Sequence, residues 1–402
     1  MAVIGECAMK VNVFLVLVVA GLLFLTACGG KGTAKEPTIK LITIFDGNTF
    51  DLCEPEVRAY LNAETEEDQV RTIREMENVS YQHQTVLFAW ESDGSSEFTV
   101  YIADNPKFEN AYEFKTAKTE LKKEAGILVP GTTYYWKVVG DKEGSTSKVD
   151  SLKTLDAPGR FITTEGIPNV RDIGGWKTAD GKKVKYGLVY RGGKTNNTGI
   201  NSCSPYDNKL FSETLGVETE IDLRTQDADD GGQSKSVFDD VFYYKTTLTQ
   251  YSYIFPDFEQ EEPMPRSYDK RSKYSIREIF KVLADEENYP IMFHCNAGAD
   301  RTGTVAFLIN GVLGVSYEDL TRDFELTAGR NRSAIVDGLF DQGGVMQDNQ
   351  NNYIAWDKMY QTMMSEYGTE DGSLASAIEN YLINVCKVQE TEIESLKSIM
   401  LE

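Results

Sequence analysis

The segment between residues 290 and 313 limits the possible folds of this chain more than any other. A short, mainly apolar strand pattern at residues 290–294 leads directly into Cys295, and five residues separate Cys295 from Arg301. A helical pattern at residues 302–313 follows at once. A buried strand that passes through a short loop into a helix is typical of α/β domains. We therefore expect an α/β domain in which Cys295 ends a strand.

The loop after this strand has the chemistry of a phosphate site. Backbone N–H groups at a helix start bind anions, and Gly298 permits the tight turn that such a loop needs. Arg301 offers a planar fork that binds two oxygens and stays charged. A positive field of this kind stabilises a thiolate, so Cys295 is the candidate nucleophile. The predicted phosphate-binding residues are Asn296, Ala297, Gly298, Ala299, Asp300 and Arg301.

Two neighbours of the loop are candidate supporting residues. His294 is expected to fix the loop from behind through hydrogen bonds of its ring, and Thr302 to donate its hydroxyl to the thiolate. Charged residues at other strand ends are expected to pair with one another and to shape the domain, because charges at strand ends usually pair. These are Arg171, Asp172, Arg191, Asp222 and Arg224.

The run His294-Cys295-x-x-Gly298-x-Asp300-Arg301-Thr302-Gly303 resembles the signature of the protein tyrosine phosphatase superfamily, and specifically its bacterial and fungal branch. The resemblance extends to residues 169–175, 187–191 and 221–225 and to the helical C-terminus. It implies an α/β (α+β) tyrosine phosphatase fold over residues 157–402, with a central sheet flanked by helices. It also implies a phosphoric monoester hydrolase that acts on phosphotyrosine, sometimes on phosphoserine or phosphothreonine, without metal or other cofactor.

A cysteine-dependent phosphatase needs an acid for the leaving oxygen and then a base for the attacking water. Two aspartates compete for this role. Asp300 lies within the loop itself and is favoured by the resemblance. Asp257 lies upstream in an acidic segment and is the alternative, similar to the movable aspartate loop of other tyrosine phosphatases. The position of Asp300 inside the loop makes it our preferred general acid.

The charge of the chain narrows its partners. A formal net charge of −22 repels nucleic acid at long range, so any phosphate must be bound locally. We expect a phosphorylated protein or a small phosphomonoester as substrate. Many family members carry lysine where this chain has Ala299, which weakens the alternative of an inositol phosphate or phosphoinositide phosphatase. A catalytically retired surface-binding lipoprotein is the remaining alternative. Two histidines and no close cysteine pair suggest no zinc site and no disulfide framework.

The N-terminus predicts secretion and a lipid anchor. A predominantly apolar run at residues 11–25 has the length of a signal sequence, and Lys10 just before it makes Met9 a better start than Met1. The run ends in Leu-Thr-Ala before Cys28, which resembles the lipobox of bacterial lipoproteins. We expect a signal peptide at residues 1–27, lipid on Cys28, a flexible tether at 28–38, and anchoring in the bacterial cell envelope, periplasmic or surface-exposed.

Residues 39–156 are expected to form an all-β sandwich ahead of the phosphatase-like part. Strand patterns occur at residues 85–90, 97–103, 133–139 and 151–154, separated by polar turns. The run 128–138 resembles the fibronectin type III turn, with Tyr134 as the corner tyrosine and Trp90 as a core tryptophan. Residues 54–77 fit less well and have a partly helical pattern. This region is expected to act as a spacer, with binding of an unknown protein or glycan as the alternative.

Overall fold

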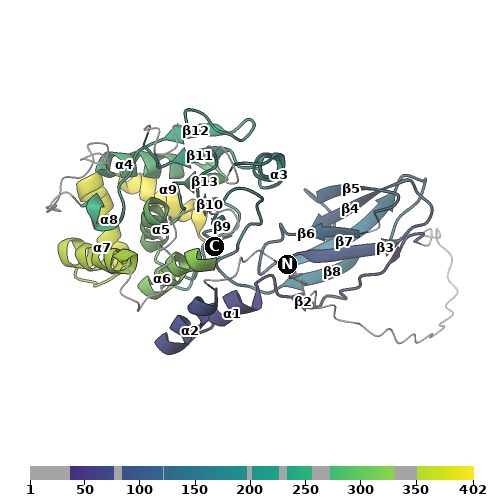
Figure 1. Cartoon of the computed structure of the whole chain (residues 1–402), viewed down its shortest axis with the longest axis horizontal. Coiled ribbons are helices and arrows are strands. Elements are labelled where there is room, and N and C mark those ends of the chain that lie inside the picture. Colours follow the sequence, from purple (N-terminus) through teal and green to yellow (C-terminus); the bar gives the residue numbers. More distant parts are fainter. Residues whose placement is uncertain are drawn as a thin grey trace, which may run out of the picture. The chain divides into compact units, whose positions relative to one another are not determined.

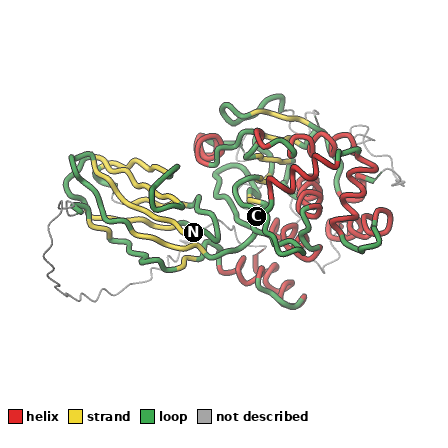
Figure 2. Tube along the Cα trace, turned by 180° about the vertical axis from the view of Figure 1, so that it is seen from behind, coloured by secondary structure: helices red, strands yellow, loops and turns green. Residues whose placement is uncertain are grey.

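The computed structural model describes residues 37–76, 84–120, 122–196, 202–225, 233–255, 272–329 and 351–402. The predicted signal peptide, Cys28, most of the tether and Asp257 lie outside these ranges. In Figure 2 strands dominate the N-terminal part and helices gather in the C-terminal part. Among the described residues, no helix has both the length and the apolarity that crossing a membrane requires.

The N-terminal part contains two sheets around one core (Figure 1). One has the strand order β1 (Lys40–Leu41), β3 (Val86–Glu91), β6 (Lys122–Ala125). The other has the order β2 (Thr49–Phe50), β8 (Asp150–Thr154), β7 (Thr133–Gly140), β4 (Glu97–Ala103), β5 (Tyr112–Ala117). Trp90 and Trp136 are fully buried between them. The four predicted strands are therefore confirmed within a residue or two.

The tyrosine corner is present in its expected geometry. The hydroxyl of Tyr134 accepts a hydrogen bond of 2.9 Å from the backbone N–H of Val129, five residues upstream. Burial raises the pKa of Tyr134 to about 12, so the phenol stays protonated. This bond ties the start of β7 to the loop before it. Membership of the fibronectin type III class remains a prediction.

The expectation that residues 39–156 are all β is wrong in one place. Helices α1 (Pro55–Leu61) and α2 (Glu66–Met76) lie between β2 and β3. Pro55 begins α1 at a position where its missing N–H is no loss, and Val57 and Tyr60, three residues apart, share one buried face. Both pack into the core that also holds the C-terminal helices. The segment is therefore helical because packing against this core stabilises its short apolar face.

The C-terminal part is built on a five-stranded sheet. Its order is β12 (Phe242–Lys245), β11 (Thr219–Asp222), β13 (Ile291–His294), β10 (Val189–Gly192), β9 (Arg171–Asp172). The first four strands are parallel, and β9 is an antiparallel edge. In register, His294 lies between Gly192 and Asp222. Because parallel strands end at the same edge, the segments that follow these three residues meet there.

Helices cover both faces of this sheet, as Figure 1 shows. On one face, Ile291 and Phe293 pack into a core with α4 (Ser272–Leu283), α5 (Asp300–Val312), α8 (Leu374–Tyr381) and α9 (Glu390–Met400). On the other face, Tyr190 and Met292 pack against the segment formed by α3 (Pro205–Lys209) and a π-helical turn at Leu210–Thr214. Alternate residues of the strands thus serve opposite faces, which confirms the predicted sheet flanked by helices.

The remaining helices complete the C-terminal part. Helix α6 is Tyr317–Glu325, and α8 continues into a π-helical turn at Leu382–Cys386. Helix α7 is Asn351–Tyr367, and short 3₁₀ turns lie at Tyr251–Ile254, Glu286–Asn288 and Leu326–Gly329. Ser316 caps α6 by accepting a bond from the N–H of Asp319.

Candidate active site

The predicted cysteine loop lies between β13 and α5, as the sequence indicated. Cys295 directly follows β13 and is 1% exposed, and α5 begins at Asp300. Gly298 has a φ of +70°, and a Cβ there would lie 2.6 Å from the carbonyl carbon of Gly192. Glycine is therefore required twice over, by the backbone conformation and by the close approach of the chain after β10. The loop can be this tight because Gly298 has no side chain.

The carbonyl groups of this loop are held from the outside. The side-chain amide of Asn169 donates to the carbonyls of Ala297 and Gly298, at 3.2 and 2.9 Å. Arg191 also donates to the Gly298 carbonyl, at 2.9 Å. In a trans peptide the N–H points opposite to the carbonyl. The N–H groups that follow these carbonyls, on Gly298 and Ala299, are therefore turned to the other side, as a phosphate cradle requires.

A buried ion network stands behind these bonds. Asp323 of α6 accepts from Arg171 at 3.0 Å and from Arg191, and Arg171 also donates to the side chain of Asn169. Burial alone would raise the pKa of Asp323, but the two guanidinium groups hold the pKa below its ordinary value. The sequence predicted that Arg171 and Arg191 belong to a charged network, and both bind Asp323. Asn169 and Asp323 had no predicted role.

A second network fixes the end of β13 from the opposite side. His294 Nε2 lies 2.9 Å from Glu220 Oε1, and its Nδ1 lies 3.4 Å from the Cys295 carbonyl oxygen. Glu220 also accepts bonds from Thr195 and Gln233. Burial alone would raise the pKa of Glu220, but the hydrogen bond from His294 holds it below its ordinary value. His294 therefore does support the loop from behind, through partners that the sequence reading missed.

The other charged residues of the predicted network also have charged partners. Asp222 accepts two bonds of 2.9 Å from the Arg224 side chain, and both residues are fully buried. Asp172 lies 3.3 Å from Arg160 and accepts from the N–H groups of Gly174 and Gly187. These bonds join strand ends to turns, which is the structural role that the sequence favoured.

The candidate general acid has a tyrosine partner. The hydroxyl of Tyr251 donates to Asp300 Oδ1 at 2.7 Å, and the N–H of Tyr251 donates to the Thr304 hydroxyl at 2.8 Å. Tyr251 is 2% exposed, and burial together with the charge of Asp300 raises its pKa well above the ordinary value. The phenol therefore stays a donor. Tyr251 lies shortly before Asp257 in the chain, and the sequence pattern gave no sign of its role.

The remaining predicted residues lie where the sequence placed them, with one difference. Arg301 is 7% exposed and belongs to the first turn of α5, while Asn296 is half-buried. The hydroxyl of Thr302 was expected to donate to the thiolate, but in the structure it donates to the carbonyl oxygen of Gly192 at 3.5 Å. Asp257 lies outside the described residues, so the choice between the two acids stays open.

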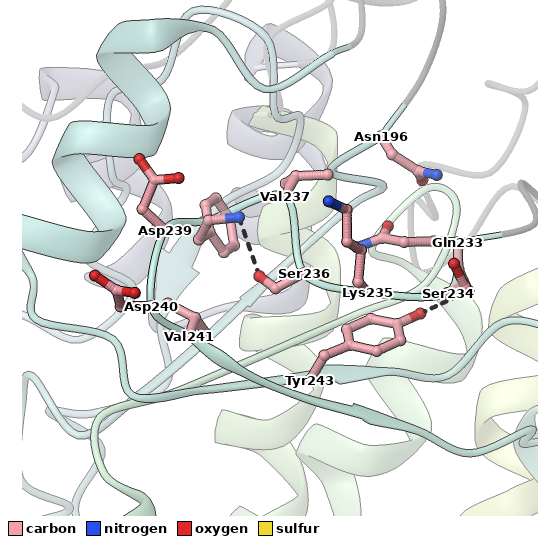
Figure 3. Close-up of a pocket in the computed structure, with 11 residues that line it drawn as sticks. Asn196, Gln233, Ser234, Lys235, Ser236, Val237, Asp239, Asp240, Val241 and Tyr243 are labelled. Carbon is pink, nitrogen blue, oxygen red and sulfur yellow. Dashed lines mark hydrogen bonds between the residues drawn. The ribbon is translucent and has the colours of Figure 1, made fainter.

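A cavity of about 750 Å³ lies near the same edge of the sheet. Figure 3 shows Asn196 and Gln233 at one end of it, and Asp239 and Asp240 at the other. Gln233 belongs to the His294 network, whereas no residue of the loop 295–301 lines the cavity. The cavity is thus a neighbour of the cysteine loop and not its phosphate cradle. Within the described ranges, no three His, Cys, Asp or Glu side chains are arranged to hold a metal ion.

The ion network around Asp323 allows a test of stability. Replacing Asp323 by asparagine leaves two buried guanidinium groups without their carboxylate, so we expect a loss of about 3 to 5 kcal/mol in the free energy of unfolding. Asp319→Asn on the same helix is the matched control. Its partner Arg322 is about a quarter exposed, and the expected loss is below about 1 kcal/mol. Urea denaturation of both variants measures the difference; equal losses contradict the role given to Asp323.

The same variant has a predicted pH dependence. A carboxyl group whose pKa is lowered by folding stabilises the protein above its unfolded pKa of about 3.9, and this contribution is lost as the pH falls through the folded value. The stability gap between wild type and Asp323→Asn should therefore be constant near neutrality and shrink below about pH 4. A gap that stays undiminished well below about pH 4 contradicts this assignment.

Comparisons with known proteins agree with this geometry. The model of the Tyrosine phosphatase family matches residues 162–402. A tyrosine-protein phosphatase of Nostoc commune is 31% identical over 125 residues, which cover 28% of this chain and 41% of that protein. A putative tyrosine-protein phosphatase of Cupriavidus necator is 25% identical over 182 residues, 42% of this chain and 64% of that protein. The matched region thus spans less than two thirds of either relative.

Among solved structures, the core catalytic domain of the PP-IP phosphatase SIW14 from S. cerevisiae in complex with citrate is similar at 14% identity. The match covers 42% of this chain and 86% of that chain, with a TM-score of 0.24. A similarity at this level carries no argument about substrate.

Proposed function

Because the chain belongs to the tyrosine phosphatase family, we propose that it hydrolyses phosphomonoesters through a cysteinyl-phosphate intermediate. One observation carries the proposal. Asn169 and Arg191 draw the carbonyls of Ala297 and Gly298 outward, which turns the following N–H groups inward, beside the buried Cys295. An array of inward N–H groups at a helix start binds the three non-bridging oxygens of a phosphate.

The reaction has two balanced steps. First, the Cys295 sulfur forms a bond to phosphorus while the bond between phosphorus and the leaving oxygen breaks, and Asp300 gives its proton to that oxygen. Water then attacks phosphorus, Asp300 takes its proton, and the sulfur leaves as thiolate. Arg301 binds two phosphate oxygens through both steps. Tyr251 orients Asp300 by donating to its Oδ1.

Phosphotyrosine is the first substrate that we propose, with phosphoserine and phosphothreonine as further ones. Its phosphate stands at the end of a long side chain and reaches a buried cysteine without an extended basic groove, which suits a chain of net charge −22. An inositol phosphate or phosphoinositide is the alternative. Loss of catalytic activity is disfavoured because the buried networks around Asp323 and Glu220 hold the loop in shape. A site without catalytic activity would not need its loop to be held in this way.

The location remains a proposal based on sequence pattern. We infer that Cys28 carries the lipid anchor and that the enzyme acts in the cell envelope, with residues 39–156 as a spacer between the anchor and the phosphatase. Mass measurement of the protein from bacterial membranes tests this directly, since a lipid-modified N-terminal Cys28 is expected and an unmodified N-terminus contradicts it.

The activity is tested by a substrate panel, with the full chain under reducing conditions and with chelator present. The panel contains a phosphotyrosine peptide, a phosphoserine peptide, a phosphoinositide and inositol hexakisphosphate. We expect turnover that is fastest on the phosphotyrosine peptide. Faster turnover of either inositol compound favours the alternative substrate class, and no turnover of any of the four contradicts the phosphatase proposal.

A further inference from the structure

Lys194 occupies a fixed position beside the cysteine loop. Its backbone N–H donates to the carbonyl of Asn296 at 2.9 Å, the first residue after Cys295. The residues on both sides of it are also held. The N–H of Gly193 donates to the Pro168 carbonyl at 2.8 Å, and the hydroxyl of Thr195 donates to Glu220 at 3.0 Å. The backbone that carries this lysine is therefore rigid and adjacent to the candidate phosphate site.

The ammonium group of Lys194 has no anionic partner within the described part of the chain. Neighbouring cations at this edge of the sheet do have one, since Arg224 and Lys245 both bind Asp222. Lys194 is half-buried, and its burial and the nearby charge of Arg224 lower its pKa. A half-buried cation beside another cation, without a carboxylate, is costly unless an anion joins it.

A cavity lies two residues further along the same segment. Asn196, two residues further along, lines the cavity of about 750 Å³ described above. Figure 3 shows Asn196 and Lys235 near the end of the cavity that Gln233 also lines. The segment that holds Lys194 beside the cysteine loop thus reaches this cavity at Asn196.

We propose that Lys194 binds a second anionic group of the substrate, close to the phosphate that is hydrolysed. This inference rests on the proposed phosphatase function and specifies its substrates. The second group is a carboxylate of an acidic residue next to phosphotyrosine, or a second phosphate on a small polyol. With Ala299 in place of a lysine, residues 296–300 of the loop contain no cation. Lys194 supplies a cation from a different segment that meets the loop only in the folded chain.

Equilibrium binding to the full chain carrying Cys295→Ser tests the proposal without turnover. The ligands are a phosphotyrosine peptide flanked by alanines, the same peptide flanked by glutamates, and an inositol bisphosphate. We expect the added Lys194→Gln change to weaken the glutamate-flanked peptide or the bisphosphate about tenfold, and the alanine-flanked peptide less than about twofold. Lys194→Arg should keep the affinity. Lys281→Gln, an exposed lysine of α4, is the control that should change nothing.

The outcomes separate cleanly. Weaker binding of the glutamate-flanked peptide identifies a carboxylate as the second anionic group. Weaker binding of the bisphosphate identifies a second phosphate. Equal loss on all three ligands, or no loss on any, overturns the proposal while leaving the phosphatase function in place. If the protein carrying only Cys295→Ser binds none of the three ligands, the proposed function and this inference both fail.

Discussion

Replacing Cys295 by serine should reduce turnover of p-nitrophenyl phosphate by about four orders of magnitude or more, while phosphate binding survives. The serine hydroxyl is a far weaker nucleophile at neutral pH than a thiolate. Binding survives because the cradle consists of backbone N–H groups and Arg301, which the change does not touch. Initial rates and phosphate affinity, measured on the same preparation, check both halves of the expectation.

The control for this result is Cys203→Ser. Cys203 is a half-buried cysteine of the same domain, and its thiol is directed to the carbonyl of Ser204. Burial and nearby carboxylates raise its pKa to about 12, so it is not a nucleophile at neutral pH. We expect a rate within about twofold of the wild type. A comparable loss in both variants indicates a general effect of removing a cysteine and contradicts the special role of Cys295.

Replacing Asp300 by asparagine should lower turnover by about 100- to 10,000-fold on a substrate with a poor leaving group such as phenyl phosphate. The loss should be much smaller on p-nitrophenyl phosphate, because that leaving oxygen needs no proton. Asparagine keeps the hydrogen bond from Tyr251, so the variant changes proton transfer and little else. The ratio of the two rates is the measurement that isolates the role of the acid.

Asp257→Asn is the matched variant for the rival acid. If Asp300 is the acid, Asp257→Asn keeps the wild-type ratio between the two substrates. If the dependence on leaving group appears in Asp257→Asn and not in Asp300→Asn, the assignment is reversed, and Asp257 becomes the acid. Tyr251→Phe adds a finer test, with a smaller loss than Asp300→Asn expected, because it removes only the bond that orients the carboxyl.

The cysteine loop was predictable because its requirements are local. A strand, a glycine that must adopt positive φ, and a helix start all lie within residues 290–303, and each leaves its own mark on the sequence. That Arg171 and Arg191 would each have a charged partner was predictable, since buried charges at strand ends need partners. Their common partner Asp323 was not, because it lies 152 residues from Arg171 and meets it only through packing of α6.

The supporting residues that the sequence reading missed share this property. Asn169 lies 128 residues from Ala297, and Glu220 lies 74 residues from His294. Nothing in the local pattern of a buried Glu in a strand indicates that a histidine of the neighbouring strand will bind it. Strand register does not identify this pair either, because the β11 residue opposite His294 is Asp222, whereas Glu220 lies opposite Met292. Lys194 was missed for the same reason.

For helices α1 and α2, the local pattern was visible but the surface they pack against was not. Residues 54–77 have a partly helical pattern, but an all-β region was predicted there. Tyr60 explains why it is helical, since its hydroxyl donates to Glu325 at 2.6 Å and its ring is fully buried in the C-terminal core. A short amphipathic helix of this kind depends on a surface to bury its apolar face, and that surface comes from residues far away in the chain.

The covalent intermediate is the central claim, and rapid acid quenching during turnover of a phosphotyrosine peptide tests it most directly. Digestion and mass spectrometry then locate the phosphoryl group. We expect it on the sulfur of Cys295, absent from the Cys295→Ser protein and absent before substrate is added. Steady turnover with no phosphoryl group on Cys295 at any quench time, or with one on another residue, would contradict the account.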